Sequence, residues 1–570
     1  MRIRKLLRVR FVVYSFTEQE KIMAELTPMM QKYMETKEQY KDCILFYRLG
    51  DFYEMFFDDA IVASKELEIA LTGKSCGLEE RAPMCGIPYH AVETYLARLV
   101  SRGYKVAICE QVEDPKLAKG LVKREVIRVV TPGTNLDVQS LEASKNNYLM
   151  CIAYTSDGIG ISAADVTTGD YYVTEVEDLR KLKDELMKYE PSEIICNEAF
   201  LVSGYDVEDL KSRLHMSVSS LESHMFDDDG CRRILMRHFK VNTLIGLGVE
   251  EFPTGILAAG ALLQYLYDTQ KTDLEHFTHI SPYLTSKYML LDSSTRRNLE
   301  LTETLREKQK RGSLLWVLDK TKTAMGGRLL RNYIEQPLID KEEMEKRLDA
   351  IQELNQDSIS RDEIREYLNP VYDLERLLSK VTYKTANPRD LIAFRNSLQM
   401  LPPIKTVLAG FQKEELAAIR EEIDGLEDIY QLIDEAIVEE PPISIREGGM
   451  IKDQFDETID HLRAAKHDGK QWLVQLEEED RERTGIKNLK IKKNNVFGYF
   501  FEVTNSYKDL VPEDYIRKQT LANAERYTTP RLKELEDTIL NAEDKLQTLE
   551  YDIFCRIRDT IAQELVRIQN

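Results

Sequence analysis

The alternation of apolar and polar positions predicts a compact strand–turn–strand–helix unit near the start of the chain. An apolar and aromatic run at 43–47 is typical of a buried strand, and the Gly-Asp pair at 50–51 marks a turn. A short extended segment at 52–56 follows, and a helix is expected from 58 through 71.

The extended segment places two unlike side chains on one face. Alternate residues of a strand share a face, so Phe52 and Glu54 point one way while Tyr53 and Met55 point the other. An ordinary strand with a core phenylalanine and a solvated glutamate would give this pattern. The alternative is an exposed phenylalanine at a sheet edge, which is a candidate wedge between DNA base pairs.

A second group of strands is predicted further along the chain. A meander of three strands precedes a helix near 178–188 and a fourth strand, and these strands are expected at 148–154, 158–166, 169–173 and 193–196. A meander followed by αβ units is typical of a ribonuclease-H-like arrangement. This arrangement raises the alternative of a two-metal nuclease, whose chemistry needs several carboxylates that converge on metal ions about 4 Å apart. The first strand has no carboxylate and Asp165 is a lone candidate, more typical of a strand end, so the pattern disfavours a nuclease.

The remainder is dominated by helical periodicity. Residues 283–445 predict the core helices of an α-domain, and a long helix is expected to end near Thr484-Gly485. Strand-like residues at 489–503 follow, with a turn at 493–495. A second long helix should begin at Thr529-Pro530 and continue in phase through Ile568, spanning roughly 60 Å. Because the last residues show no stop signal, the chain is expected to end inside this helix.

Composition limits the function classes. A chain of 570 residues should hold several domains. The net charge is −21, yet residues 485–533 contain ten basic and five acidic side chains, a local excess of +5 that fits either a solvated hairpin or a phosphate-binding surface. The eight cysteines show no zinc-ligand spacing and fit a reduced cytoplasmic setting, and no stretch has the length of a membrane span.

Several motifs, taken in order, resemble the MutS family of DNA mismatch repair proteins. In the first region they are FYRLGDFYEMF at 46–56, PMCGIPYHAV at 83–92, VAICEQ at 106–111 and RVVTPGT at 128–134. In the helical region they are LLDSSTRRNLEL at 290–301, GSLLWVLD at 312–319 and TAMGGRLL at 323–330. In the last region they are REGG at 446–449, RTG at 483–485, GYF at 498–500 and TLANAERY at 520–527.

The resemblance implies a multidomain fold, α/β followed by mainly-α. The implied parts are a mixed α/β mismatch-binding domain at 23–137, a ribonuclease-H-like connector at 138–282, a helical core-lever domain at 283–467 and 529–570, and a β-rich clamp between long helices at 468–528. Residues 1–22 precede the usual beginning of the family and are interpreted as a non-native or disordered extension.

The resemblance also implies roles for particular residues. Phe52 would stack on a mispaired or unpaired base, and Glu54 would hydrogen-bond that base. Residues expected to contact the DNA backbone are Arg124, Arg128, Lys490, Lys492, Lys493, Asn494, Asn495, Lys508 and Asn523.

The implied function is recognition of mismatches or small loops in double-stranded DNA by a bacterial, cytoplasmic and nucleoid-associated protein. The alternative is a MutS relative that binds recombination junctions or acts as a structural DNA clamp, although such relatives lack the Phe-x-Glu pair or the whole first domain. No G-x-x-x-x-G-K-[ST] motif is present, since Gly73-Lys74-Ser75 lacks the earlier glycine. The chain is therefore expected to have no catalytic, cofactor or metal site. ATP, Mg²⁺, homodimer formation and a MutL-type partner are implied for the full-length protein.

Overall fold

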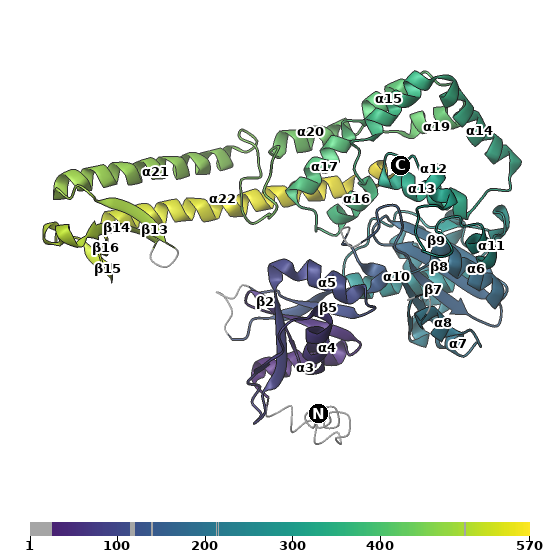
Figure 1. Cartoon of the computed structure of the whole chain (residues 1–570), viewed down its shortest axis with the longest axis horizontal. Coiled ribbons are helices and arrows are strands. Elements are labelled where there is room, and N and C mark those ends of the chain that lie inside the picture. The colour runs from purple at the N-terminus through teal and green to yellow at the C-terminus, as the bar shows by residue number, and fades with distance from the viewer. Residues whose placement is uncertain (1–25, 114–119, 138–140, 213, 215, 495–497) are drawn as a thin grey trace.

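The computed structural model describes residues 26–113, 120–137, 141–212, 214, 216–494 and 498–570 (Figure 1). Mixed α/β units occupy the first part of the chain, and the middle is largely helical. This confirms the coarse prediction of fold class. The interpretation of residues 1–22 lies outside the described residues.

The first unit is a six-stranded sheet in the order β3-β4-β2-β1-β5-β6, with helices on both faces. Its strands are β1 (Cys43–Leu49), β2 (Phe52–Phe56), β3 (Thr72–Lys74), β4 (Ala82–Pro88), β5 (Lys105–Gln111) and β6 (Arg124–Val130). Its helices are α3 (Pro28–Gln39), α4 (Phe57–Leu67) and α5 (Val92–Val100). Side chains of α4 and α5 pack on the face that carries Tyr53 and Met55, and α3 packs on the other face, against Phe56.

The predicted strands and turn of this unit are confirmed, but the predicted end of the helix is wrong. Helix α4 ends at Leu67 rather than residue 71, because Glu68 adopts a left-handed conformation with φ 58°. Its backbone N–H bonds to the Ser64 carbonyl and closes the last turn.

The second unit is a six-stranded sheet in the order β11-β10-β7-β8-β9-β12, and the predicted meander forms its centre. The strands are β7 (Leu149–Tyr154), β8 (Ile159–Asp165), β9 (Asp170–Val176), β10 (Glu193–Cys196), β11 (Ser217–Ser220) and β12 (Ser281–Pro282). The helices are α6 (Leu179–Tyr189), α7 (Glu198–Leu201), α8 (Val207–Ser212), α9 (Asp228–His238) and α10 (Pro253–Gln270). Helix α10 covers one face and contributes much of the core.

The helical middle region confirms the predicted periodicity. Its helices are α11 (Ser293–Asn298), α12 (Leu314–Leu318), α13 (Ala324–Glu335), α14 (Lys341–Gln356), α15 (Ser358–Leu368), α16 (Leu374–Thr382), α17 (Pro388–Leu398), α18 (Leu401–Leu408), α19 (Glu414–Glu422) and α20 (Glu427–Ala436). Side-chain caps begin several of them; the Asp373 carboxylate, for example, accepts the Arg376 N–H at the start of α16.

Two long helices, α21 (Glu457–Thr484) and α22 (Pro530–Gln563), run side by side away from the rest of the protein (Figure 1). Between them in sequence, and at their far end in space, is a four-stranded sheet that we call the distal sheet. Its order is β13-β14-β16-β15, from β13 (Lys490–Asn494), β14 (Gly498–Thr504), β15 (Ile516–Thr520) and β16 (Ala524–Thr528). The predicted caps are confirmed: Gly485 ends α21 in a left-handed conformation, and the Thr529 hydroxyl accepts the Leu532 N–H.

Two details of this region differ from prediction. The expected turn includes Lys493 and Asn494, but both pair with β14 as part of β13, and Asn495 lies outside the described residues. The second long helix stops at Gln563, and a separate helix α23 (Leu565–Gln569) follows. The Gln569 side chain bonds to Thr278 and to the His276 carbonyl of the second unit, which fixes this short helix there.

Candidate nucleic-acid interface

Strand β2 presents Phe52 at the exposed end of the first sheet. The Phe52 side chain is 47% exposed, whereas Tyr53 and Met55 are buried on the opposite face. Glu54 points to the same face as Phe52 and is half-buried. Gly50, at φ 59°, provides the left-handed residue that the tight turn into β2 requires. The predicted division of the two faces is therefore confirmed.

Strand β4 pairs with β2 and lies next to Phe52 and Glu54. Pro88 lies opposite Phe52, and Gly86 lies opposite Glu54. A Cβ atom at Gly86 would lie 3.5 Å from Glu54 Cγ and 3.9 Å from Phe52 Cδ1. The absence of a side chain at Gly86 keeps the space between the ring and the carboxylate open.

The turn that carries Phe52 is held by a polar cluster. The Arg48 guanidinium lies 3.9 Å from the centre of the Tyr89 ring and 3.1 Å from a Glu110 carboxylate oxygen. The Tyr53 hydroxyl also donates to Glu110, and burial together with this hydrogen bond raises the pKa of Tyr53. The Tyr89 N–H donates to the Asp51 carbonyl at 3.0 Å. These contacts hold the turn that carries Phe52 in place.

Glu54 has a partner that sequence reasoning missed. Lys74 Nζ lies 2.6 Å from Glu54 Oε2, although Lys74 belongs to β3 and the two strands are separated by β4. The ammonium also lies 5.5 Å from the centre of the Phe56 ring. In the sequence, Lys74 stood out only as part of an incomplete phosphate-binding motif.

The two arginines predicted to contact DNA both donate to groups within the protein. Arg124 donates to the carbonyls of Arg48 and Val122, at 2.7 and 2.8 Å. Arg128 instead faces the second unit, where it donates to Gln270 Oε1 at 3.2 Å and to the Thr134 carbonyl at 3.1 Å. Burial lowers the pKa of Arg128. The guanidinium of Arg128 is used between the two units, and its phosphate contact stays a prediction.

The basic residues predicted in β13 lie on two faces of the distal sheet. Lys490 and Lys492 share the face directed away from the long helices. Lys492 forms an ion pair with Glu502 at 2.7 Å, and Lys490 is exposed without an ion-pair partner among the described residues. Lys493 lies on the opposite face, 3.9 Å from Glu543 of α22.

The other predicted positions lie in the same part of the chain. Lys508 pairs with Glu525 at 2.8 Å, and Asn523 is exposed in the turn between β15 and β16. Asn494 ends β13 opposite Gly498. The structure thus groups these positions in the distal sheet and in the turns that join its strands, at the far end of the long helices from the unit that carries Phe52 (Figure 1).

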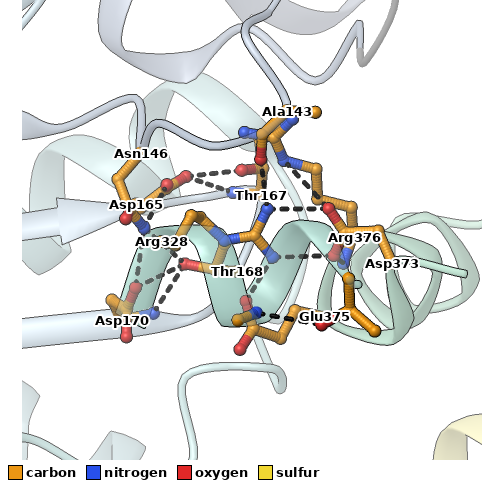
Figure 2. A network of polar contacts seen from close by, with 12 residues as sticks. Ala143, Asn146, Asp165, Thr167, Thr168, Asp170, Arg328, Asp373, Glu375 and Arg376 are labelled. Atoms are coloured by element: carbon orange, nitrogen blue, oxygen red, sulfur yellow. Dashed lines mark hydrogen bonds and ion pairs between the residues drawn. The ribbon is translucent and has the colours of Figure 1, made fainter. Parts of the chain in front are cut away.

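Asp165, the residue weighed as a nuclease ligand, belongs to a buried hydrogen-bond network (Figure 2). Its carboxylate accepts the Asn146 amide at 2.9 Å, the Asn147 N–H at 3.0 Å and the Thr167 hydroxyl at 2.7 Å. Asp170 shares Asn146, and burial and the nearby Asp165 raise the pKa of Asp170. No group of three metal-ligating side chains occurs in the described part of the chain. The contacts of Asp165 are those of a strand-end residue.

Two buried arginines join this network to the helical region (Figure 2). Arg328 of α13 forms a fork with Asp373, both contacts being 2.7 Å, and reaches Glu375 at 2.5 Å and the Ala143 carbonyl at 2.8 Å. Arg376 donates to the carbonyl of Lys145 at 2.8 Å. Together they hold the segment before β7 against α13 and α16.

Among the described residues, none of the helices combines the length and the apolar content that crossing a membrane requires.

Comparison with known families matches most of the chain. Family models of MutS domain I, MutS domain II and MutS domain III match residues 27–139, 147–280 and 294–570 in that order. The chain belongs to the MutS family. Phe52 and Glu54 lie in the MutS domain I match, and the distal sheet lies in the MutS domain III match.

Curated relatives agree. The chain is 66% identical to the DNA mismatch repair protein MutS of Lachnoclostridium phytofermentans over 547 residues, 96% of this chain and 59% of that protein. It is 54% and 53% identical to the proteins of the same name from Ruminiclostridium cellulolyticum and Acetivibrio thermocellus, covering 96% of this chain and 63% of each relative. The chain thus spans about three fifths of the length of these MutS relatives.

Proposed function

We propose that this chain recognises mispaired or unpaired bases in duplex DNA, as the sensor of a mismatch repair protein. The observation that carries the proposal is the exposed Phe52 with Glu54 on the same face, carried by a turn that several contacts hold in place. Stacking of a base on an aromatic side chain contributes about 1–3 kcal/mol, and unstacking a base is least costly at a mismatch. Phe52 is thus suited to stack on a base of the duplex only at a position where base pairing is weak.

Glu54 supplies the polar half of the proposed contact. Lys74 holds Glu54 Oε2 at 2.6 Å, so the carboxylate can accept a hydrogen bond from an N–H group of the base through Oε1.

The distal sheet supplies affinity without sequence preference. Lys490 and Lys492 project from its outer face, and contacts of such residues with phosphates are independent of base identity and weaken with salt. We therefore propose this sheet as the clamp. We also propose the first sheet as the mismatch-binding domain, the second as a ribonuclease-H-like connector, and the remaining helices as the core-lever domain.

The longer relatives suggest what this chain does within a complete protein. We propose that a complete family member would bind ATP and Mg²⁺ through residues outside this chain, form a homodimer, and act with a MutL-type partner in the bacterial cytoplasm. No catalytic residue is assigned to the chain itself.

Binding measurements with Phe52→Ala test the proposal. Affinities for a G·T duplex and for its matched control are measured at one salt concentration, for the unaltered chain and the variant. Phe52→Ala should lower the preference for the mismatch by about 5- to 150-fold, the equivalent of one stacked base. Ile127→Ala is the control, because Ile127 is 45% exposed in the same sheet and should leave the preference unchanged.

The possible outcomes separate the candidate functions. Equal binding of both duplexes by the unaltered chain, with no effect of Phe52→Ala, would refute mismatch recognition and leave a DNA clamp without mismatch specificity. Preference for a four-way junction over both duplexes would favour the junction-binding alternative.

A further inference from the structure

The carboxylate beside Phe52 is not free in the unbound protein. Lys74 Nζ lies 2.6 Å from Glu54 Oε2, and the lysine crosses the width of β4 to reach it. The side chains of Lys74 and Glu54 are 34% and 17% exposed, so water and a ligand can both reach the pair. Among the described residues, Lys74 is the one polar side chain that bonds to the Glu54 carboxylate.

This ion pair fixes the orientation of Glu54. Oε2 is engaged by the ammonium, which leaves Oε1 available for a ligand, and the missing side chain at Gly86 keeps the space toward Phe52 open. The ammonium also offsets the negative charge of Glu54. Without it, a bare carboxylate would meet the phosphates of any approaching duplex, and like charges at such distances repel.

We propose that Lys74 is a positioning residue for Glu54 and that their ion pair sets the selectivity for mispaired over paired bases. The inference rests on the proposed function of the Phe52 site. Two effects of Lys74 must be separated. Its charge attracts every duplex equally, whereas its hold on Glu54 matters only for the duplex whose base Glu54 contacts.

A double-mutant cycle separates the two effects. Affinities for a G·T duplex and a matched G·C duplex are measured at fixed salt for the unaltered chain, Lys74→Met, Glu54→Gln and the double variant. Circular dichroism spectra and thermal unfolding confirm that each variant is folded. In the unaltered background, Lys74→Met should reduce the ratio of the two affinities by about three- to fivefold, the effect expected from the loss of one partly exposed ion pair.

In the Glu54→Gln background, Lys74→Met should weaken both duplexes equally and leave the ratio unchanged, because the residue that Lys74 positions is gone. Lys74→Arg keeps the charge and a donor within reach, so it should retain most of the selectivity. Lys32→Met removes an equal charge from α3, where Lys32 pairs with Glu35 at 3.3 Å, and should not change the ratio.

Three results would overturn the inference. A ratio above one that Lys74→Met leaves intact would reject it while leaving the proposed function standing. An equal fall of the ratio with and without Glu54 would show that Lys74 reads the DNA itself rather than acting through Glu54. A ratio of one for the unaltered chain would reject the proposed function, and the inference with it.

Discussion

Replacing Arg328 with methionine should loosen the junction between the second unit and the helical region. Arg328 is 4% exposed and binds Asp373, Glu375 and the Ala143 carbonyl (Figure 2). Methionine has a similar length but no donor, so Asp373 would lose both bonds of the fork and keep only the Arg376 N–H at 3.3 Å and the Arg376 guanidinium at 3.8 Å. Removal of one member of a buried ion pair is costly, because the remaining charge keeps its desolvation penalty.

The exposure of Asp373 and of Glu375 determines how much local stability the Arg328→Met variant loses. The Asp373 side chain is 16% exposed, so most of the penalty arises there, and we expect a local loss of about 3 kcal/mol. Glu375 is 44% exposed, so water replaces its lost partner and its share is below about 1 kcal/mol. The loss should be confined to α13, the start of α16 and the segment before β7.

Native-state hydrogen exchange suits this prediction, because a multidomain chain does not unfold in one two-state step. The free energy of opening is compared for amides of α13 and α16 in the unaltered chain and in Arg328→Met. Arg232→Met is the matched control: Arg232 also contacts two carboxylates, Asp228 at 3.0 Å and Glu250 at 2.9 Å, but on the surface. The control should lose less than about 1 kcal/mol. Equal losses in the two variants would refute the reasoning from burial.

Two further predictions concern the distal sheet. Lys490→Ala should reduce the slope of log affinity against log salt by about 0.9 for either duplex, the value for one phosphate contact, whereas Lys181→Ala in α6 should not; an unchanged slope would exclude Lys490 from the interface. Gly498→Ala should release β14 from α22, because its Cβ would lie 1.6 Å from Glu536 Oε1, and exchange of the nearby amides reports the release. Gly485→Ala is the control, because Gly485 has nearly the same φ as Gly498, 69° against 70°, but nothing lies within 4 Å of a Cβ built there. Comparable losses of amide protection in both variants would mean that backbone strain, rather than the contact with Glu536, causes the effect.

Sequence pattern was sufficient where neighbouring residues determine the structure. The alternation at 52–56 predicted which residues of β2 share a face, because the period of a strand is two, but it left open which face is buried; the structure buries Tyr53 and Met55. Thr529-Pro530 and Gly485 likewise predicted helix ends, since capping depends on the first and last turn alone. The end of α4 at Leu67 was not predicted, because nothing in the sequence of residues 68–71 indicates that Glu68 adopts a positive φ.

Contacts between distant segments could not be predicted in the same way. Arg128 was predicted as a phosphate ligand from the family motif that begins at this residue, yet its side-chain partner Gln270 lies 142 residues further along the chain. Lys74 reaches Glu54 only because β3 is placed at the edge of the first sheet and its side chain extends back over Phe56. Both contacts depend on the sheet order and on the packing of the units, which local periodicity does not encode.

Phe52 combines an exposed ring with a turn that is held by several contacts. Phe52 is 47% exposed, so its ring gives up part of the stabilisation that full burial of a phenylalanine would provide. Its support nevertheless uses a cluster of Arg48, Glu110 and Tyr89, more structure than a solvent-exposed turn needs. Under the proposed function, an aromatic ring that enters a base stack must not bend away when it meets resistance, so the proposal requires both a well-held turn and an exposed ring. The proposed role of Lys74 follows the same reasoning, because its ion pair would hold Glu54 in place before a base is bound.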